Sequence, residues 1–257
     1  MAEKPIIFSG EMVRAILDGR KTQTRRVIKP QPGSARVVKT NHPRQAPETI
    51  FGVLPDKEDD GKFSGYLEPG SPAGIEQYAA YRPGDLLWVR ESFKYLNKQR
   101  TKVGYKASPD ETCTDGPFVR LGNWKPSIHI PKWAARLWLK VLKVRAERVQ
   151  EISTIEAMRE GVLPEPDARV ETKICVMGKQ PREIFGLVWD SLNAKPKPAK
   201  KNPYTAEPEL CQVAYPWEDV REITTINRKA SKWYGLKVYV CGNPAIFVYE
   251  FERTNHG

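Results

Sequence analysis

The sequence has no long apolar stretch and few of the residues that build metal centres or disulfide frameworks. No run of about 18 apolar residues is present and the N-terminus lacks a signal-peptide pattern, so we expect a cytoplasmic chain with no membrane partner. The four cysteines show no Cys-x-x-Cys spacing, which argues against a zinc site or a disulfide framework and suits a reducing compartment. With only three histidines as well, the sequence predicts neither a metal site nor a cofactor.

What the sequence has in excess is positive charge. Its 257 residues include 42 Lys and Arg against 31 Asp and Glu, a formal net charge of +11. The first 44 residues alone hold ten basic and three acidic residues, so most of the excess lies near the N-terminus. A basic chain favours anionic partners, and we expect a nucleoside or RNA. The alternative is a generally basic surface without such a partner.

An amphipathic helix is expected close to the N-terminus, after a short apolar strand at residues 6–8. Ser9 is placed to cap this helix, and Gly19 to end it in the left-handed region. The apolar positions of the helix follow helical spacing: Met12, Val13, Ile16 and Leu17.

A run of four cations and two hydroxyls follows this helix in residues 20–26. We interpret it as a basic loop in which Lys21 and Thr24 are close enough in sequence to converge on one pocket. The alternative is an ordinary solvated loop, which is how most charge runs are used.

Two further helices and several strands are predicted from periodicity. One helix is capped by Ser153 and ended by Gly161, and the other spans residues 181–193, whose apolar stripe predicts a core face. The strands are expected at residues 86–93, 103–106, 118–121, 127–130, 136–150 and 245–252.

The remaining segments are rich in proline, glycine and charge. Residues 29–82 are interpreted as a long insertion that carries a small hairpin from 37–38 and 49–54. Residues 195–201 are predicted to form an exposed linker, and a helix is expected near residues 218–229. Strands that follow one another without regular βαβ alternation predict an α+β fold with a mixed or antiparallel β-barrel.

The order of several motifs resembles that of ASCH-domain proteins, which are relatives of the PUA-like β-barrels. The matching motifs are Gly19-Arg20-Lys21-Thr22-Gln23-Thr24-Arg25 after the first helix, Pro83-Gly84-Asp85 before a strand, Glu160-Gly161-Val162, and the terminal Phe247-Val248-Tyr249-Glu250-Phe251. The chain is similar to a longer ASCH subgroup that phages and prophages often encode, in which case its compartment is the host cytoplasm.

The resemblance implies one elaborated domain over residues 1–257, a PUA-like mixed or antiparallel β-barrel with flanking helices and long insertions. Its core would comprise about residues 4–28, 83–162 and 243–253. The insertions would be about residues 29–82 and 163–242.

Small bacterial ASCH proteins are N4-acetylcytidine amidohydrolases, and the resemblance implies a metal-free hydrolase of an acylated cytosine nucleoside or a related modified base. The catalytic roles fall by resemblance on Lys21, Thr24 and Glu160. A lysine can act as a base only if burial lowers its pKa well below about 10.4, and a paired carboxylate opposes that shift. An ordinary Lys21–Glu160 ion pair is the alternative.

Other ASCH relatives are ribonucleases or RNA-binding modules, and both functions remain alternatives here. A ribonuclease would use Lys21 with His129 or Tyr105. A substrate base could stack on an aromatic ring, and an acidic side chain could accept from a cytosine amino group. The expected substrate-binding residues are Arg20, Thr22, Arg25, Arg26, Trp88, Arg90, Glu91, Tyr105, Trp124, Ser127 and His129.

Overall fold

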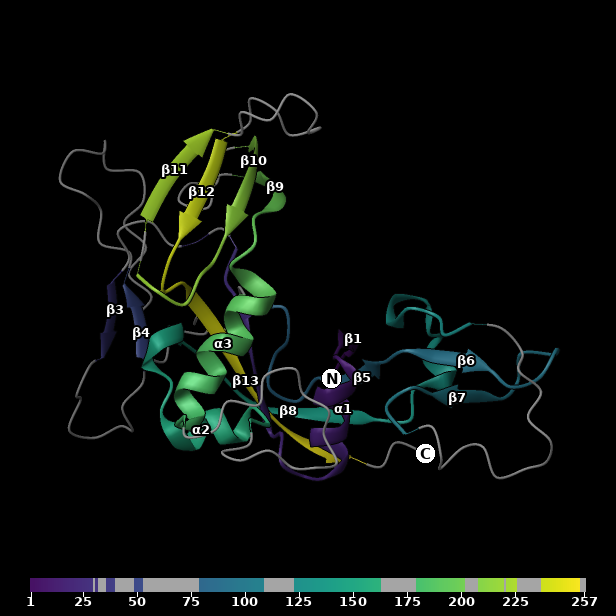
Figure 1. The fold of residues 1–257 in the computed structure, drawn as a ribbon. Helices are drawn as coiled ribbons and strands as arrows, with labels where there is room; N and C mark the ends of the chain where they lie inside the picture. The colour runs from purple at the N-terminus through teal and green to yellow at the C-terminus, as the bar shows by residue number, and fades with distance from the viewer. Residues whose placement is uncertain are drawn as a thin grey trace.

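A curved five-stranded sheet organises the fold (Figure 1). The computed structural model describes residues 1–29, 31, 36–39, 49–52, 79–108, 123–162, 179–201, 208–219, 221–225 and 237–254. The strand order is β1-β5-β8-β13-β2, in which β1 and β5 are parallel and the other pairs antiparallel. The strands are β1 (Glu3–Ile7), β2 (Gln23–Val27), β5 (Leu86–Arg90), β8 (Trp138–Arg148) and β13 (Ala245–Thr254).

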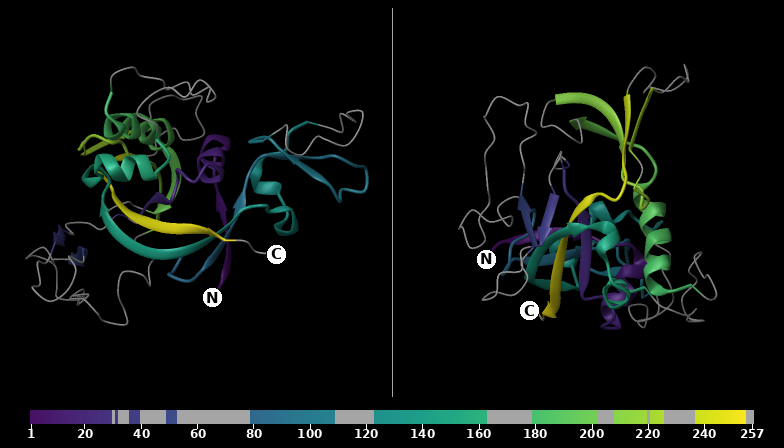
Figure 2. Two further views of the ribbon diagram at one scale, coloured as in Figure 1. Left: turned by 90° about the horizontal axis from the view of Figure 1, so that it is seen from below. Right: turned by 90° about the vertical axis from the view of Figure 1, so that its left-hand side faces the viewer.

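Three helices cover the two faces of this sheet. Helix α1 (Gly10–Leu17) packs on the face formed by residues such as Phe247 and Tyr249. Helices α2 (Thr154–Arg159) and α3 (Pro181–Asn193) pack on the opposite face, where alternation along β13 places Ile246 and Val248. Figure 2 shows β8 and β13 curving together through the centre of the molecule.

The sheet is open among the described residues, because no backbone pairing joins its edge strands β1 and β2. A side chain bridges the two edges instead. Arg26 Nη2 donates to the carbonyl oxygen of Ile7 at 2.8 Å, and its guanidinium lies 5.6 Å from the Phe8 ring centroid. The predicted α+β class is confirmed, whereas a closed barrel is not seen in the described strands.

A second sheet and two hairpins are attached to this core. The four-stranded sheet has the order β11-β12-β10-β9. Its strands are β9 (Lys197–Lys201), β10 (Pro208–Ala214), β11 (Arg221–Thr225) and β12 (Lys237–Cys241). The hairpins pair β3 (Arg36–Lys39) with β4 (Thr49–Gly52), and β6 (Phe93–Tyr95) with β7 (Val103–Tyr105).

Several predicted elements are confirmed. Ser9 Oγ accepts from the Met12 backbone N–H at the start of α1, and Gly19 has φ +73° after its end. Ser153 and Glu156 form the predicted capping box of α2. The small hairpin and the strands β5, β7, β8 and β13 also lie where they were expected, as does α3. The predicted strand at residues 118–121 lies outside the described residues.

Four predicted elements were wrong. Residues 23–27 of the expected basic loop form β2, an edge strand of the main sheet. The expected strand at 127–130 contains the short 3-10 helix η2 (Ser127–His129) between two prolines, which cannot donate to a ladder. The expected linker at 195–201 contains β9, an edge strand, where Pro198 and lysines are tolerated. Residues 221–225 form β11 rather than a helix, since its Ile-Thr-Thr run favours a strand.

Within the described residues, no helix combines the length and apolar character needed to cross a membrane.

Candidate functional site

The turn between α1 and β2 fixes the position of Lys21. Its backbone N–H donates to the carbonyl of Ala15 at 2.9 Å, which ties the residue to the end of α1. The next N–H, that of Thr22, donates to the carbonyl of Arg159 at the end of α2. Lys21 therefore lies where α1, α2 and β2 meet.

The Lys21 side chain is fully buried and its ammonium group is saturated with acceptors. Nζ donates to Glu160 Oε2 at 2.7 Å, to the Glu160 carbonyl at 2.9 Å and to the Gln23 carbonyl at 2.9 Å. The exposed fraction is 0% for the Lys21 side chain and 6% for that of Glu160. An ammonium group has three donors, so every one is used.

Thr24 lies next to one of these acceptors. The Phe251 N–H donates to the Thr22 carbonyl, so the Gln23 carbonyl faces away from β13, toward the free edge of β2. Lys21 Nζ therefore binds the carbonyl group directly before Thr24. The Thr24 side chain, only 3% exposed as a residue, points to the face of β2 opposite to Gln23 and Arg25.

The structure thus brings Lys21 and Glu160 into direct contact and places Thr24 beside the backbone anchor of Lys21. Among the described residues, the Thr24 hydroxyl makes no hydrogen bond to either partner.

A larger charge network continues from Glu160 beneath α2. Arg25 Nη1 donates to Glu160 Oε1 at 3.0 Å, and Arg25 Nη2 to Glu147 Oε1 at 2.7 Å. Arg145 lies on the same face and pairs with three carboxylates. Those carboxylates belong to Glu147, Glu156 and Glu250.

Burial sets the proton affinity of Lys21. Removal from water lowers the pKa of its ammonium group below the ordinary 10.5 of lysine, and this is the largest effect. The Glu160 carboxylate opposes the shift, and the charges of Arg26 and Arg25 add to it. The net direction is downward, which is the direction that a lysine base requires.

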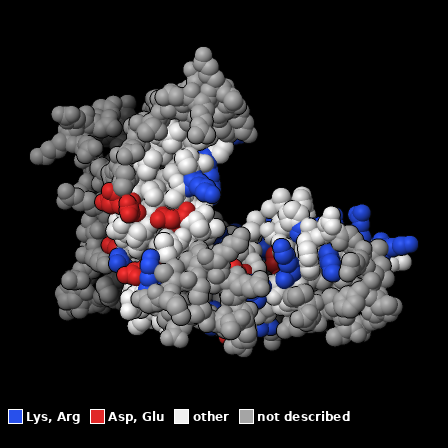
Figure 3. Space-filling view, in the orientation of Figure 1, with Lys and Arg blue, Asp and Glu red and all other residues white. Residues whose placement is uncertain are grey.

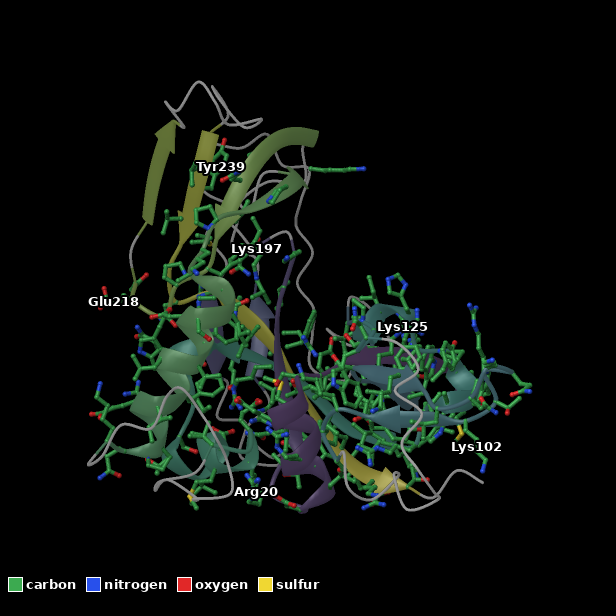
Figure 4. All side chains as sticks on the ribbon, turned by 45° about the vertical axis from the view of Figure 1, so that its right-hand side comes forward. Arg20, Lys102, Lys125, Lys197, Glu218 and Tyr239 are labelled. Atoms are coloured by element: carbon green, nitrogen blue, oxygen red, sulfur yellow. The ribbon has the colours of Figure 1, made fainter. Side chains whose placement is uncertain are left out.

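A cleft of about 530 Å³ opens at this junction of helices and sheet. Gln23 contributes a buried amide, whose Nε2 donates to the Glu156 carbonyl at 2.7 Å while Oε1 has no hydrogen-bond partner. Figure 4 shows the neighbouring Arg20 at the end of α1. The residues that line the cleft are Ile16, Gly19, Lys21, Thr22, Gln23, Leu139, Leu142, Arg159, Glu250, Phe251, Glu252 and Arg253.

Aromatic rings gather on the Thr24 face of the sheet. Tyr249 is directly opposite Thr24 in the β2–β13 register, and its ring centroid lies 5.1 Å from that of Tyr81. The Phe8 ring lies 5.6 Å from Lys21 Nζ and 6.2 Å from the Phe251 ring. These rings, rather than tryptophans, form the aromatic surroundings of Lys21 and Thr24.

The three arginines of the basic run, expected to bind substrate, are all engaged within the protein. Arg25 is buried in the charge network, and Arg26 bridges the sheet edges. Arg20 donates to Asp18 Oδ2 at 2.7 Å and to the Gly161 carbonyl at 3.2 Å. Thr22 is exposed and lines the cleft.

The other predicted substrate-binding residues lie elsewhere, around the β6–β7 hairpin, and none lines the cleft. Glu91 is paired with Arg136 at 2.8 Å, and the Tyr105 hydroxyl donates to the Ala134 carbonyl at 2.7 Å. Arg90 donates to the Ile128 carbonyl at 2.6 Å. The structure therefore separates these residues from Lys21: Trp88, Arg90, Glu91, Tyr105, Trp124, Ser127 and His129.

Sequence reasoning missed several residues of the site. Gln23, Arg145 and Glu147 were not singled out, although Arg145 and Glu147 lie two residues apart on one face of the predicted strand. Charged residues two apart on one face of a buried strand are a signal for a paired cluster. Phe8 and Tyr249 carried no such signal, because they read as ordinary core residues.

Within the described residues, no three His, Cys, Asp or Glu side chains are grouped so that they could hold a metal ion. Comparisons with protein-family models, with curated proteins and with solved structures gave no match. The function is therefore argued from the geometry of the site.

Proposed function

We propose that this chain is a hydrolase of an acylated cytosine nucleoside or a related modified base, as in ASCH-domain amidohydrolases. One observation carries the proposal. Lys21 is fully buried, is held by Glu160 at 2.7 Å, and binds the carbonyl group next to Thr24. In this proposal the open five-stranded sheet is the PUA-like barrel, with its seam between β1 and β2.

The Thr24 hydroxyl would be the nucleophile. Neutral Lys21 takes the hydroxyl proton while Thr24 Oγ1 forms a bond to the acyl carbon. The bond from that carbon to the N4 nitrogen then breaks, and the Lys21 ammonium returns its proton to the leaving amine. Water, deprotonated by Lys21 in the same way, then attacks the acyl carbon of the Thr24 ester. The bond from that carbon to Thr24 Oγ1 breaks, the Lys21 ammonium returns its proton to Oγ1, and the carboxylic acid leaves.

Glu160 acts as a positioning residue in this scheme. Its carboxylate and its backbone carbonyl hold Lys21 Nζ in place and stabilise the charged form. The lowered pKa of Lys21 makes the neutral amine accessible despite that contact. Phe251, Leu139 and Leu142 line the cleft beside Lys21 and would provide apolar surface for the substrate base.

An HPLC assay of N4-acetylcytidine turnover tests the proposal. Lys21→Ala and Thr24→Val should each lower kcat by about 10²- to 10⁴-fold, since each removes one proton-transfer or nucleophilic partner. Lys143→Ala, at an exposed position of β8, is the matched control and should keep wild-type turnover. A wild-type protein as inert as Lys21→Ala toward N4-acetylcytidine, both free and within an oligonucleotide, would remove the hydrolase proposal.

A non-catalytic RNA-binding module is the second candidate function. The observation that favours it is the basic and aromatic surface around β6 and β7, which lies apart from the cleft at Lys21. The ribonuclease alternative gains no such support, because Tyr105 and His129 lie around β6 and β7, whereas the neighbours of Lys21 Nζ are Glu160 and the Gln23 carbonyl.

A further inference from the structure

The β6–β7 module, defined as residues 93–108 and 123–136, is strongly basic. It contains eight Lys and Arg and no Asp or Glu. The intervening residues 109–122, which lie outside the described part, add three carboxylates and one arginine. The formal charge of residues 93–136 is still +6, more than half of the total for the chain.

Most of these cations have no counter-ion within the described residues. Arg136 is paired with Glu91, and Lys132 with Glu3. The other six make no ion pair with a described carboxylate and are available to an anionic ligand. They are Lys94, Lys98, Arg100, Lys102, Lys106 and Lys125.

Aromatic rings alternate with these cations on the surface of the module. Lys94 Nζ lies 5.0 Å from the Trp124 ring centroid, and the Arg100 guanidinium lies 5.6 Å from that of Tyr95. Trp124 is 37% exposed and Trp133 is 59% exposed. Surfaces that bind single strands combine aromatic rings, on which bases stack, with cations that contact phosphates.

The module projects from the rest of the molecule as an arm. Figures 1 and 2 show β6 and β7 extending away from α2, α3 and the second sheet. Figure 3 shows Lys and Arg side chains along the arm, and Figure 4 places both Lys102 and Lys125 on it. An exposed ring can stack only on a base that is not already paired, so a single strand fits this surface better than a duplex.

A short series of contacts connects the arm to Lys21. At the base of the arm, Arg90 Nη2 donates to the Ile128 carbonyl at 2.6 Å, and the Arg90 carbonyl accepts from the Phe8 N–H at 3.4 Å. The Phe8 ring then lies 5.6 Å from Lys21 Nζ. These contacts join the base of the arm to the buried contact between Phe8 and Lys21.

We infer that the β6–β7 module is a docking surface for single-stranded nucleic acid, bound through phosphates on its lysines and through bases stacked on Trp124. A second part of the inference rests on the proposed function: the modified base that the hydrolase acts on lies within a strand, rather than in a free nucleoside.

Fluorescence anisotropy with a labelled single-stranded RNA of about 12 nucleotides tests the docking surface at several salt concentrations. The double variant Lys98→Glu/Lys102→Glu should bind at least roughly tenfold more weakly. Its plot of log affinity against log salt should be flatter by about 1.4, because each lost phosphate contact removes about 0.7 for single strands. Trp124→Ala should weaken binding by roughly tenfold and leave the salt slope unchanged.

The matched control is Lys195→Glu/Lys200→Glu, which makes the same charge change at two exposed positions, one just before β9 and one within it. It should keep wild-type affinity and slope. Equal weakening in the two double variants, or no binding by the wild type, would overturn the docking surface. Single-stranded DNA of the same sequence separates contacts shared by both polymers from contacts to RNA alone, and either result supports the inference.

Turnover separates the two parts of the inference. The ratio of kcat/KM for N4-acetylcytidine within a strand to that for the free nucleoside should fall in Lys98→Glu/Lys102→Glu and stay constant in the control. A constant ratio in both would overturn the second part. Strand binding that behaves as expected in a protein that hydrolyses neither substrate supports the docking surface and rejects the hydrolase.

Discussion

Lys21 shows how one residue can be both a cation and a candidate base. Its three hydrogen bonds favour the charged form, whereas complete burial favours the neutral form and prevails. Because its folded pKa lies below 10.5, the unfolded state binds more protons between these two values. In that window the contribution of Lys21 makes the free energy of unfolding rise with pH.

Glu160→Gln should move the acidic limb of the kcat/KM profile to lower pH. The Glu160 charge raises the pKa of Lys21, so removing it lowers that pKa further, and a base with a lower pKa becomes active at lower pH. Glu147→Gln is the control, since Glu147 contacts Arg25 and Arg145 and makes no bond to Lys21. A limb that stays fixed in Glu160→Gln, or moves upward, contradicts Lys21 as the base.

The sequence pointed to Lys21 through its basic run, but it joined Lys21 to Glu160 only through a family resemblance. Their contact is between residues 139 positions apart, and no local pattern encodes such a distance. The burial of Arg25 could not be predicted for a related reason: an arginine that contacts a ligand at the surface and one in a buried ion pair look alike in a basic run. Only the folded structure shows that Arg25 is buried, because its partners Glu147 and Glu160 come from distant segments of the chain.

At the scale of elements, the end of α2 is fitted closely against α1 and Lys21. Gly161 has φ +90°, and a Cβ atom there would lie 2.8 Å from Ala15 Cβ and 3.3 Å from Lys21 Cβ. Glu160, the neighbouring residue, caps the helix and supplies the carboxylate. The absence of a side chain at Gly161 therefore allows the end of α2 to pack directly against Lys21.

Gly161→Ala should lower the free energy of unfolding by about 2–4 kcal/mol, because a left-handed backbone and a steric clash act together. Gly84→Ala is the matched control, since Gly84 has φ +87° and nothing within 4 Å of the added Cβ. It should lose only about 1–2 kcal/mol. Urea unfolding measures both, and equal losses would show that the helix end is not closely packed.

Elements with strong local signals were predictable from the sequence. Capping residues and an apolar stripe located α1, α2 and α3, and apolar runs located β8 and β13. Three of the four failures were β2, β9 and β11, which are polar strands at sheet edges. An edge strand is specified by the neighbour with which it pairs rather than by its own apolar pattern, so such strands read as loops or helices.

At the scale of the whole molecule, Trp217 joins the second sheet to the main one. The backbone N–H of Trp217 donates to Asp190 Oδ1 of α3 at 2.7 Å, and its backbone carbonyl accepts from Gln150 Nε2 at 2.7 Å. Its ring packs edge-on against Phe185 at 6.0 Å. Helix α3 thus contacts Trp217, which lies in the connection between β10 and β11 of the second sheet.

Trp217→Ala should loosen the second sheet more than the main one. Loss of a large ring from this cluster costs about 2–4 kcal/mol, at the lower end for a half-buried residue. Hydrogen exchange measured by mass spectrometry should speed up in β10 and β12 and stay slow in β8 and β13. Trp133→Ala, which removes an exposed ring, should leave all four unchanged. Equally faster hydrogen exchange in all four strands of Trp217→Ala would contradict the role of Trp217 in joining the two sheets.

The main sheet also carries a consequence for how copies of this chain meet. The outer edge of β2 ends the sheet, and an unpaired strand edge is a template on which a second chain can add its own strand. Lys21 Nζ donates to the Gln23 carbonyl on that edge. If this contact were lost, a buried ammonium group would lack one of its three acceptors. The same side chain that is proposed to move protons therefore occupies a carbonyl to which a second chain would have to bond along β2. A protein that lost this lysine would leave that carbonyl without its donor.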